Sequence, residues 1–198
     1  IIRQVGRGLY RLENGDKVIV VAEEAPTIID TIDTTPLPVR RLLPENLGDV
    51  DEQGLLTVIG YCKLLDHFTG LTVYRLRNHV RKSVKGVGQA EVDAVDVGVA
   101  LSDEETPIIF PIEAKAKADE INRVQVATQV QFARQYFKGH TIRPLAIKVD
   151  DVGMIHFVEF NDEIDTDKLH AVKRATYRLN ISDKQREFIR RTPVKVKL

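Results

Sequence analysis

The stretch "GQAEVDAVDVGV", residues 88–99, is followed by "PIIFPIEAKA", residues 107–116. Both runs are rich in valine, isoleucine and alanine, the composition of buried strands, and the acidic segment "SDEET" separates them. We therefore expect a strand over 90–101 and a second over 107–116, paired antiparallel as a hairpin. A buried carboxylate without a partner is costly, so the acids inside these strands need an explanation.

The two-residue period of a strand determines which of the acids in these strands point to the same face, and whether Lys115 points there too. Glu91 and Asp93 share one face of the first strand, while Asp96 falls on the other and is expected to be structural. Glu113 and Lys115 share a face of the second strand. Pairing of the strands would bring three carboxylates and one ammonium group together near the strand ends.

This combination of groups suits a hard divalent cation. Mg²⁺ takes one or two carboxylates, keeps several waters and completes its shell with substrate phosphate. Asp93 and Glu113 suit that role, and Lys115 can orient or deprotonate a water for attack on phosphorus. A solvent-exposed Glu113–Lys115 charge pair is the simpler alternative. Both faces of residues 108–112 are apolar, however, so the charges emerge where a central strand ends, which is where α/β sheets place their sites.

The segments around the hairpin predict an α/β fold. Helical spacing indicates a helix over 51–68 ending at Gly70, and another from Ala118 to Gly139 with Asp119 and Glu120 in its first turn. Further strands and a final helix are expected over 72–84, 143–149, 154–160, 170–179 and, as the helix, 182–191. The central order is helix, three strands, helix, strand, strand.

The N-terminal part of the sequence is organised differently. "GLYRL" and "KVIVVA" flank "ENGD", and an Asn-Gly pair between apolar runs predicts a hairpin over 7–22. Residues 25–48 hold four prolines, too many for a regular element, and indicate a linker or an arm. We therefore divide the chain into 1–48, hairpin and proline-rich linker, and 49–198, the main domain. The chain begins with Ile1, so further natural sequence is expected before it.

The composition limits the class of protein. The 198 residues are 43% hydrophobic and contain no apolar run near the ~18 residues of a membrane span, so no membrane partner is expected. Cys62 is the only cysteine, which excludes an intrachain disulfide and a thiolate zinc site and suits the cytoplasm. Lys plus Arg and Asp plus Glu balance at 29 each, so net charge does not argue for nucleic acid.

With these elements in place, "EVDAV" and "IEAK" resemble the motif of the PD-(D/E)XK nuclease superfamily of restriction endonucleases, junction resolvases and phage exonucleases. The resemblance covers about residues 50–160 and implies a restriction-endonuclease-like mixed sheet core flanked by helices. It implies Asp93, Glu113 and the carbonyl of Ala114 as metal ligands and Lys115 as the catalytic lysine, with Mg²⁺, or Mn²⁺ as a substitute. The proline of the superfamily name is absent, because Val92 precedes Asp93.

The same resemblance suggests three additions, each with an alternative. Members of the superfamily often carry an acid on the preceding helix; Asp51 and Glu52 are candidates, Glu52 is preferred, and both could instead complement the helix dipole. Gln125 and Gln129, four apart, resemble glutamines that some members direct at the active site or the DNA, although a solvated helix face is as good an interpretation. Glu91 could be a further ligand or could pair with a basic residue of the neighbouring strand.

Basic residues offer contacts to DNA phosphates. Arg75, Arg77, Arg81 and Lys82 lie on the first strand, and Lys184, Arg186, Arg190 and Arg191 on the last helix, although solvated faces explain either run. The N-terminal hairpin resembles the wing of a winged-helix domain, with an ordinary hairpin as the alternative.

The resemblance implies an Mg²⁺-dependent endodeoxyribonuclease. The stretch from "RNHVRK" through "IEAKA" looks like bacterial endonucleases of restriction or phage-defence systems, which commonly act as homodimers or in defence complexes. The alternatives are a non-catalytic nucleic-acid-binding subunit on a nuclease-like fold and a junction resolvase or exonuclease.

Overall fold

The two acid-bearing strands form the predicted hairpin. β6 (Gly88–Val99) pairs antiparallel with β7 (Ile108–Ala116), with a register that runs from Ala94↔Ile112 to Gly98↔Ile108. The structure is a computed structural model, and it describes residues 2–6, 9–12, 18–19, 29–99, 107–116 and 119–191.

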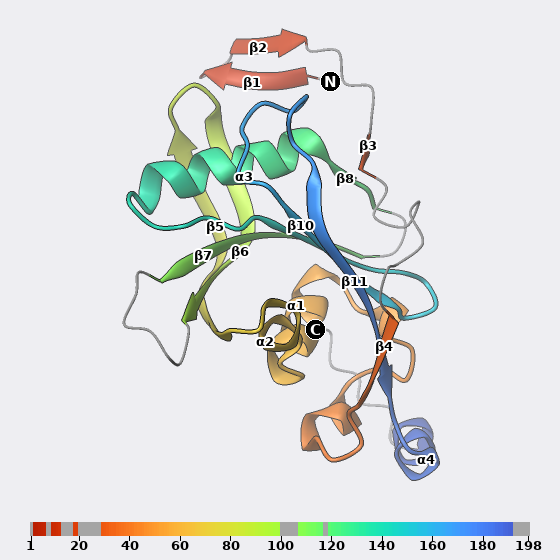
Figure 1. Ribbon diagram of the computed structural model, residues 1–198. Coiled ribbons are helices and arrows are strands. Elements are labelled where there is room, and N and C mark those ends of the chain that lie inside the picture. The colour runs from red at the N-terminus through yellow and green to blue at the C-terminus, as the bar shows by residue number, and fades with distance from the viewer. Residues whose placement is uncertain are drawn as a thin grey trace.

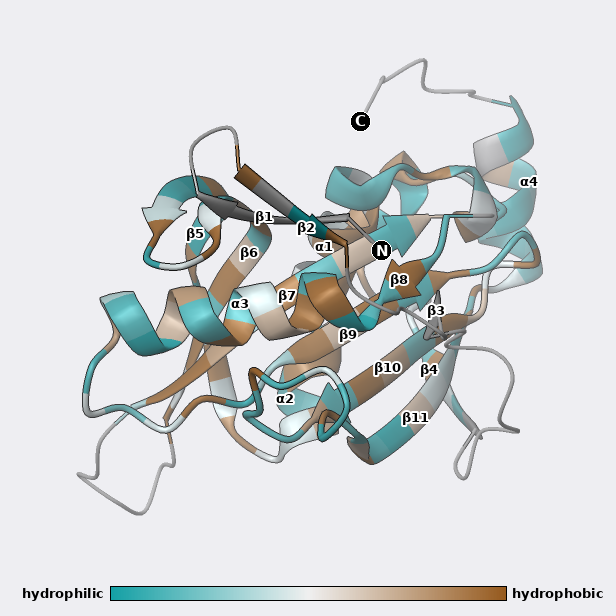
Figure 2. Cartoon of the chain, turned by 90° about the horizontal axis from the view of Figure 1, so that it is seen from above, coloured by the Kyte–Doolittle hydropathy of each residue, from teal (hydrophilic) through white to brown (hydrophobic). Residues whose placement is uncertain are grey.

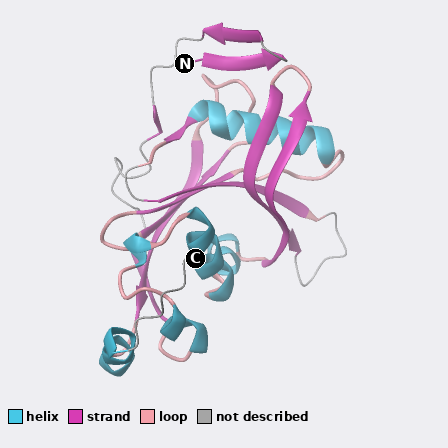
Figure 3. Ribbon diagram, turned by 180° about the vertical axis from the view of Figure 1, so that it is seen from behind, coloured by secondary structure: helices cyan, strands magenta, loops and turns pink. Residues whose placement is uncertain are grey.

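These strands belong to a seven-stranded mixed sheet, so the chain has an α/β fold (Figure 3). The β7–β9 and β4–β11 pairs are parallel, and the other neighbours are antiparallel. The order of strands across the sheet is β4 (Ile29–Asp33), β11 (Ala171–Asn180), β10 (Ile155–Phe160), β9 (Leu145–Val149), β7, β6 and β5 (Thr72–Val84).

Helices cover both faces of the sheet (Figure 1). α1 (Glu52–Tyr61) and α2 (Leu64–Thr69) lie on one face, and α3 (Arg123–Tyr136) lies on the other. The main core lies between the sheet and α1 and α2, with Phe68 packed on Phe157. Hydrophobic residues on one side of α3, which alternate with polar ones in Figure 2, pack on β6 and β7 as a second cluster. Strand β7 is therefore buried on both faces.

The ends of the helices correct two predictions. The single helix expected over 51–68 is two helices, because the backbone at Lys63 has φ 55° in the left-handed region and turns the chain before α2. α3 begins after Asn122, whose side chain accepts the N–H of Gln125 in a capping box. Asp119 and Glu120 precede this cap and are not in the first turn, because the capping side chain of Asn122 makes the helix begin at Arg123, five residues after the predicted start at Ala118.

The N-terminal hairpin predicted over 7–22 is wrong. β2 (Leu9–Leu12) pairs with β1 (Ile2–Gly6), and β3 (Val18–Ile19) pairs with β8 (Ile121–Asn122) far along the chain. Residues 13–17, with the Asn-Gly pair, lie outside the described residues. Within the described residues, the two expected arms of the hairpin thus pair with other strands and not with each other.

The proline-rich segment is more regular than its composition suggested. Its residues 29–33 form β4, an edge strand of the main sheet, while the prolines are confined to the residues around it. Two short 3-10 helices, η1 (Pro38–Leu42) and η2 (Leu47–Asp49), then lead to α1. The segment, expected to be a linker or an arm, thus contributes a strand to the main sheet, as an arm would.

The C-terminal elements match the predictions. β9 and β10 form a hairpin, β11 extends the sheet, and α4 (Asp183–Arg191) closes the described chain beside η1. No helix of the described residues is long and apolar enough to cross a membrane.

Candidate active site

The candidate site lies where β6 and β7 separate. Their pairing ends at Ala94↔Ile112, and the next residues are Asp93 and Glu113. Oδ2 of Asp93 accepts the N–H of Ala114 at 2.9 Å, so a side chain replaces the backbone partner that Ala114 would find in a continued antiparallel pair. Beyond this point β7 continues along β9, with Lys115 opposite Lys148. The carboxylates therefore sit at the fork between the two neighbours of β7.

Glu113 is at the centre of the cluster and is 5% exposed. One carboxylate oxygen accepts a hydrogen bond from Nε2 of Gln125 at 2.7 Å and lies 2.8 Å from Nζ of Lys115. The other oxygen accepts from Nε2 of Gln129 at 2.5 Å. Burial, followed by the nearby charge of Asp93, raises the pKa of Glu113 to about 7 despite these donors.

Lys115 joins the two carboxylates. Its Nζ lies 3.9 Å from Oδ2 of Asp93 as well as close to Glu113. Burial acts to lower the pKa of Lys115, but Glu113, Asp93 and Glu52 together outweigh it and raise that pKa. Burial also raises the pKa of Asp93, against the opposing effects of the Ala114 N–H and Lys115. The cluster thus holds more negative charge than one lysine neutralises.

The beginning of α1 adds a third acid near the cluster. The side chain of Asp51 is the N-cap of the helix and accepts the N–H of Gly54 at 2.7 Å. Glu52 is partly buried, and its charge acts on both Asp93 and Lys115. Of the two acids proposed from the sequence, Asp51 is occupied by the helix end and Glu52 is the one near the site.

The two glutamines of α3 point into the protein. Gln125 uses both ends of its amide, because Oε1 accepts the N–H of Asn122 at 3.0 Å while Nε2 donates to Glu113. Gln129 is fully buried, and its Oε1 accepts no hydrogen bond from the described residues. Neither side chain therefore lies on a solvated helix face, which was the simpler interpretation of their spacing. Gln125 is held by Glu113 and the helix cap, and its expected contact with DNA stays a prediction.

Glu91 is paired with basic residues of the neighbouring strand, the second of the two roles considered from the sequence, although its charge also acts on Asp93. Its carboxylate lies 2.6 Å from Arg81 and 3.2 Å from His79 on β5, and the Arg81 hydrogen bond lowers the pKa of Glu91. Val92 and Val95 pack in the same cluster although they are three residues apart. The two-residue alternation that predicted a common face for Glu91 and Asp93 is therefore broken between them.

The basic residues predicted to bind DNA lie on β5, an edge strand of the sheet. Arg77, Arg81 and Lys82 are exposed. Arg75 is committed within the protein, because its Nε donates to the buried carboxylate of Asp96 and its Nη1 donates to Asn78 at 2.5 Å. Arg75 therefore has less freedom for phosphate contact than the sequence suggested.

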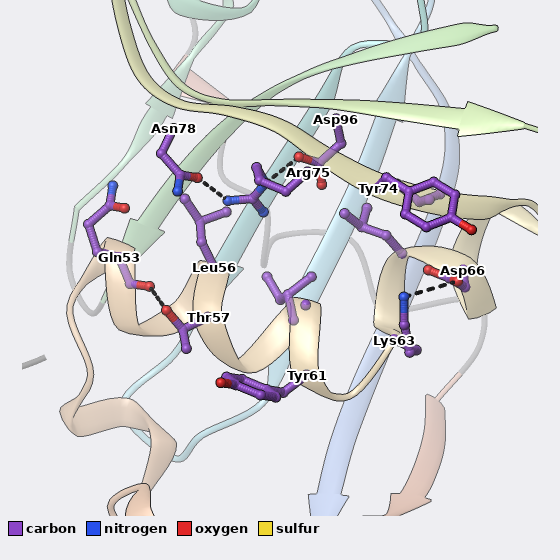
Figure 4. Close-up of a pocket in the computed structure, with 14 residues that line it drawn as sticks. Gln53, Leu56, Thr57, Tyr61, Lys63, Asp66, Tyr74, Arg75, Asn78 and Asp96 are labelled. Atoms are coloured by element: carbon purple, nitrogen blue, oxygen red, sulfur yellow. Dashed lines mark hydrogen bonds and ion pairs between the residues drawn. The ribbon is translucent and has the colours of Figure 1, made fainter. Parts of the chain in front are cut away.

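This Arg75–Asp96 pair lines a separate pocket between α1, α2 and β5, which sequence reasoning did not find (Figure 4). Burial raises the pKa of Asp96, and Arg75 opposes that rise. Gln53, Thr57 and Tyr61 of α1 form the other wall. Asp96 was expected to be structural, and its ion pair across β5 and β6 agrees with that role.

A second polar group, formed by residues of β10, β11 and the turn before β10, has the residue types of a nucleophile triad, but its hydroxyl is buried. Nε2 of His156 lies 3.1 Å from Oδ2 of Asp150, and Nδ1 lies 3.0 Å from Oγ1 of Thr176. Thr176 is 2% exposed, so a substrate cannot reach its hydroxyl. Asp150 also accepts the N–H groups of Val152 and Met154 and so stabilises the turn. This group is structural.

The donor set of the cluster fits a hard cation. Asp93 and Glu113 offer carboxylate oxygens whose pKa values are raised by burial, so a nearby cation would stabilise their charged forms. The Oε1 of Gln129, which has no partner among the described residues, can accept from a coordinated water. Among the described residues no three His, Cys, Asp or Glu side chains form a metal-binding group. Two carboxylates with waters and substrate phosphate are the set that Mg²⁺ uses in phosphoryl chemistry.

Comparisons of the chain with protein-family models, with curated proteins and with solved structures find no match.

Proposed function

We propose that the protein is a metal-dependent endodeoxyribonuclease with a restriction-endonuclease-like fold, which hydrolyses DNA phosphodiesters at the Asp93–Glu113–Lys115 cluster. The observation that carries the proposal is that Nζ of Lys115 lies 2.8 Å from Glu113 and 3.9 Å from Asp93, at the fork where β6 leaves β7. The order α1, α2, β5, β6, β7, β8, α3, β9 supports it, because it follows the helix and strand order on which the resemblance rests, apart from the division of the first helix and the two-residue β8.

Each side chain of the cluster has a defined task in this proposal. Asp93 and Glu113 hold Mg²⁺, with the carbonyl of Ala114 as a further ligand and Glu52 as the acid from α1. The ion, when bound, supplies a Lewis acid for the phosphoryl oxygens and lowers the pKa of coordinated water. Lys115 orients the attacking water and stabilises negative charge that develops on the phosphate. Gln125 and Gln129 hold the Glu113 carboxylate in one orientation.

The ion pairs inside the cluster argue against a purely structural role. Glu113 is 5% exposed, and burial together with the charge of Asp93 raises its pKa to about 7 although Lys115 and Gln129 act to lower it. A fold that needed only stability would gain from a neutral or apolar residue here, since buried ion pairs rarely stabilise more than well-packed apolar side chains. A cluster held at this cost is typical of a functional site.

The wider setting is part of the same proposal. Action in the cytoplasm, in a restriction or phage-defence system, and as a homodimer or in a defence complex, is what the sequence resemblance supports. A junction resolvase or exonuclease would use the same cluster on DNA of another shape, so substrates of several shapes belong in the test.

The decisive experiment is hydrolysis of plasmid, linear and branched DNA with Mg²⁺, with Mn²⁺ and with chelator. We expect Asp93→Asn and Lys115→Ala to lower the metal-dependent rate at least 100-fold, in the range found for single groups that stabilise a transition state. Asp165→Asn and Lys168→Ala are the matched controls, because these residues form an exposed ion pair at 3.4 Å and, within the described part of the chain, make no hydrogen bond or ion pair with the side chains of the cluster. Both controls should retain the parent rate.

Two outcomes would contradict the proposal. Equal hydrolysis by the parent and by the Asp93 and Lys115 variants would remove the cluster from catalysis. Binding of DNA without hydrolysis, by a folded parent with either metal, would favour the alternative of a non-catalytic nucleic-acid-binding subunit.

A further inference from the structure

A groove of about 570 Å³ lies between η1, η2, the end of β11 and α4. Segments far apart in the sequence supply its four arginines, Arg40, Arg178, Arg186 and Arg190. Glu45 and Asp49 are the acids that line it. We propose that this arginine groove binds a backbone phosphate of DNA outside the scissile position, an inference that rests on the proposed nuclease function.

One buried cation forms the wall of the groove. Arg40 is 1% exposed, and its terminal nitrogens donate to the carbonyls of Pro44 at 2.8 Å and Glu45 at 3.2 Å. Its Nε is buried and has no hydrogen-bond partner among the described residues. Burial, with the like charge of Arg186, lowers the pKa of Arg40. A buried cation beside another cation is costly and favours the approach of an anion.

The exposed arginines are only partly neutralised. Arg190 makes two hydrogen bonds to Glu45, at 2.8 and 2.9 Å, and Arg186 lies 3.9 Å from the same carboxylate. Arg178 donates through Nε to the sulfur of Met154 at 3.4 Å, a weak acceptor, and makes no other hydrogen bond to the described residues. One carboxylate thus serves two arginines, and a third has donors to spare.

The chemistry of the groove selects a phosphate. Guanidinium groups bind phosphate oxygens through two parallel N–H donors, and several arginines around one anion favour a group that offers several oxygens. Glu45 holds Arg190 and Arg186 in place through its carboxylate, and it also opposes the entry of a second anion. Removing the charge of Glu45 should therefore strengthen phosphate binding.

The groove and the candidate active site lie at the same end of the central strands of the sheet. The register connects Ala116 of β7 to Val149, then to Ile155, and then to Tyr177 of β11, the residue before Arg178. Three strand spacings separate β7 from β11, roughly 14 Å at 4.8 Å per spacing. A DNA strand at the cluster could therefore extend across these strand ends and reach the groove a few nucleotides away.

The test measures binding without hydrolysis. The anisotropy of a labelled duplex is followed in chelator at several salt concentrations, for the parent and for Arg178→Gln, Arg186→Gln and Glu45→Gln. Loss of one phosphate contact lowers the slope of log K against log salt by about 0.9. We expect that decrease, with roughly tenfold weaker binding at low salt, for both arginine variants and tighter binding for Glu45→Gln. Lys138→Gln, a charge change at an exposed lysine that does not line the groove, should leave the slope unchanged.

The outcomes separate this inference from the proposed function. Arginine variants that bind DNA like Lys138→Gln would overturn the groove as a DNA site, even if the parent cleaves DNA. A reduced slope in a protein that does not hydrolyse DNA would support the groove while contradicting catalysis. Titration with inorganic phosphate distinguishes the source of the anion, because variants that lose phosphate binding but keep parental DNA affinity would assign the groove to a free phosphate compound and overturn the DNA assignment. Thermal unfolding checks that each variant is folded.

Discussion

Glu113 carries an electrostatic cost that a neutral isostere should remove. Its pKa of about 7 lies above the ordinary value of 4.5, so the folded protein binds more protons than the unfolded chain between these values. Stability therefore falls as pH rises through this window. In the absence of divalent cations, we expect the free energy of unfolding of Glu113→Gln to exceed that of the parent by about 2 kcal/mol at pH 8. At pH 4 the two values should be close.

Urea unfolding at both pH values measures this difference, with the exposed Glu120→Gln as control. A Glu113→Gln variant that is less stable than the parent at pH 8 would show that the Glu113–Lys115 pair outweighs the cost of burial. The same protein should show no hydrolysis, since the carboxylate that holds the metal in the proposed mechanism is gone.

Two cross-strand ion pairs on β5 and β6 allow a direct comparison of burial. Arg75 faces Asp96, whose side chain is 3% exposed, and Arg81 faces Glu91, which is 42% exposed. Loss of one partner of a buried pair leaves an uncompensated charge, whereas an exposed pair contributes little. We expect Asp96→Asn to lower the free energy of unfolding by about 2 kcal/mol and Glu91→Gln by less than about 1 kcal/mol, both measured by urea unfolding. Equal losses would contradict the assignment of Asp96 as the buried partner.

Residue spacing predicted the centre of the site because strand pairing is local. Asp93, Glu113 and Lys115 could be assigned from two adjacent strands joined by one acidic segment. For Glu91 the sequence left two alternatives, and the structure has the one in which it pairs with a basic residue of the neighbouring strand, Arg81. Spacing could not choose between them, because the alternation breaks near Asp93, where His79 of β5 has a left-handed backbone. A sequence period carries no signal for such a local break.

At the scale of elements, predictions failed where a distant partner decided the structure. β3 pairs with β8 and β4 pairs with β11, and both partners lie more than a hundred residues away in sequence. The Asn-Gly signal described only its own neighbourhood and could not weigh these alternatives. The β9–β10 hairpin and the β6–β7 hairpin were predicted because the chain between their strands is short.

The position of α1 depends on a close backbone contact at η2. A Cβ at Gly48 would lie 2.6 Å from the carbonyl oxygen of Asp151, and Asn46 donates to the same oxygen at 3.0 Å. This contact ties the chain before Glu52 to the β9–β10 turn. We expect Gly48→Ala to lower the free energy of unfolding by about 2 kcal/mol, since backbone must move, and to reduce hydrolysis by displacing Glu52.

Gly60→Ala is the matched control for that change. Gly60 lies within α1, and a Cβ there meets nothing within 4 Å, so alanine should raise stability by about 0.5–1 kcal/mol through its helix propensity. Thermal and urea unfolding of both variants measures the contrast. A Gly48→Ala protein as stable as the parent would mean that η2 and the turn separate without cost.

At the scale of the whole molecule, two groups of opposite charge lie at the same end of the central strands of the mixed sheet. The acid and lysine cluster lies at the end of β7, and the arginine groove lies at the end of β11. The balanced total of 29 basic and 29 acidic residues concealed this separation. Arg40, Arg178 and Arg186 come from three segments that only the fold brings together, so no spacing in the sequence could have predicted the groove.

The whole chain should report metal binding at the cluster through its thermal stability. A ligand that binds only the folded state stabilises it by about 2.7 kcal/mol at one hundred times its Kd, a rise of roughly 5–10 °C in Tm for a chain of this size. Binding requires ionised carboxylates, and the pKa of Glu113 is about 7. We therefore expect a given rise in Tm to require a lower concentration of Mg²⁺ at pH 8 than at pH 6. Asp93→Asn should lose the effect at both pH values, while Asp165→Asn should keep it. The same Mg²⁺ response in Asp93→Asn as in the parent would place the bound ion elsewhere, and a response independent of pH would show that Glu113 is not its ligand.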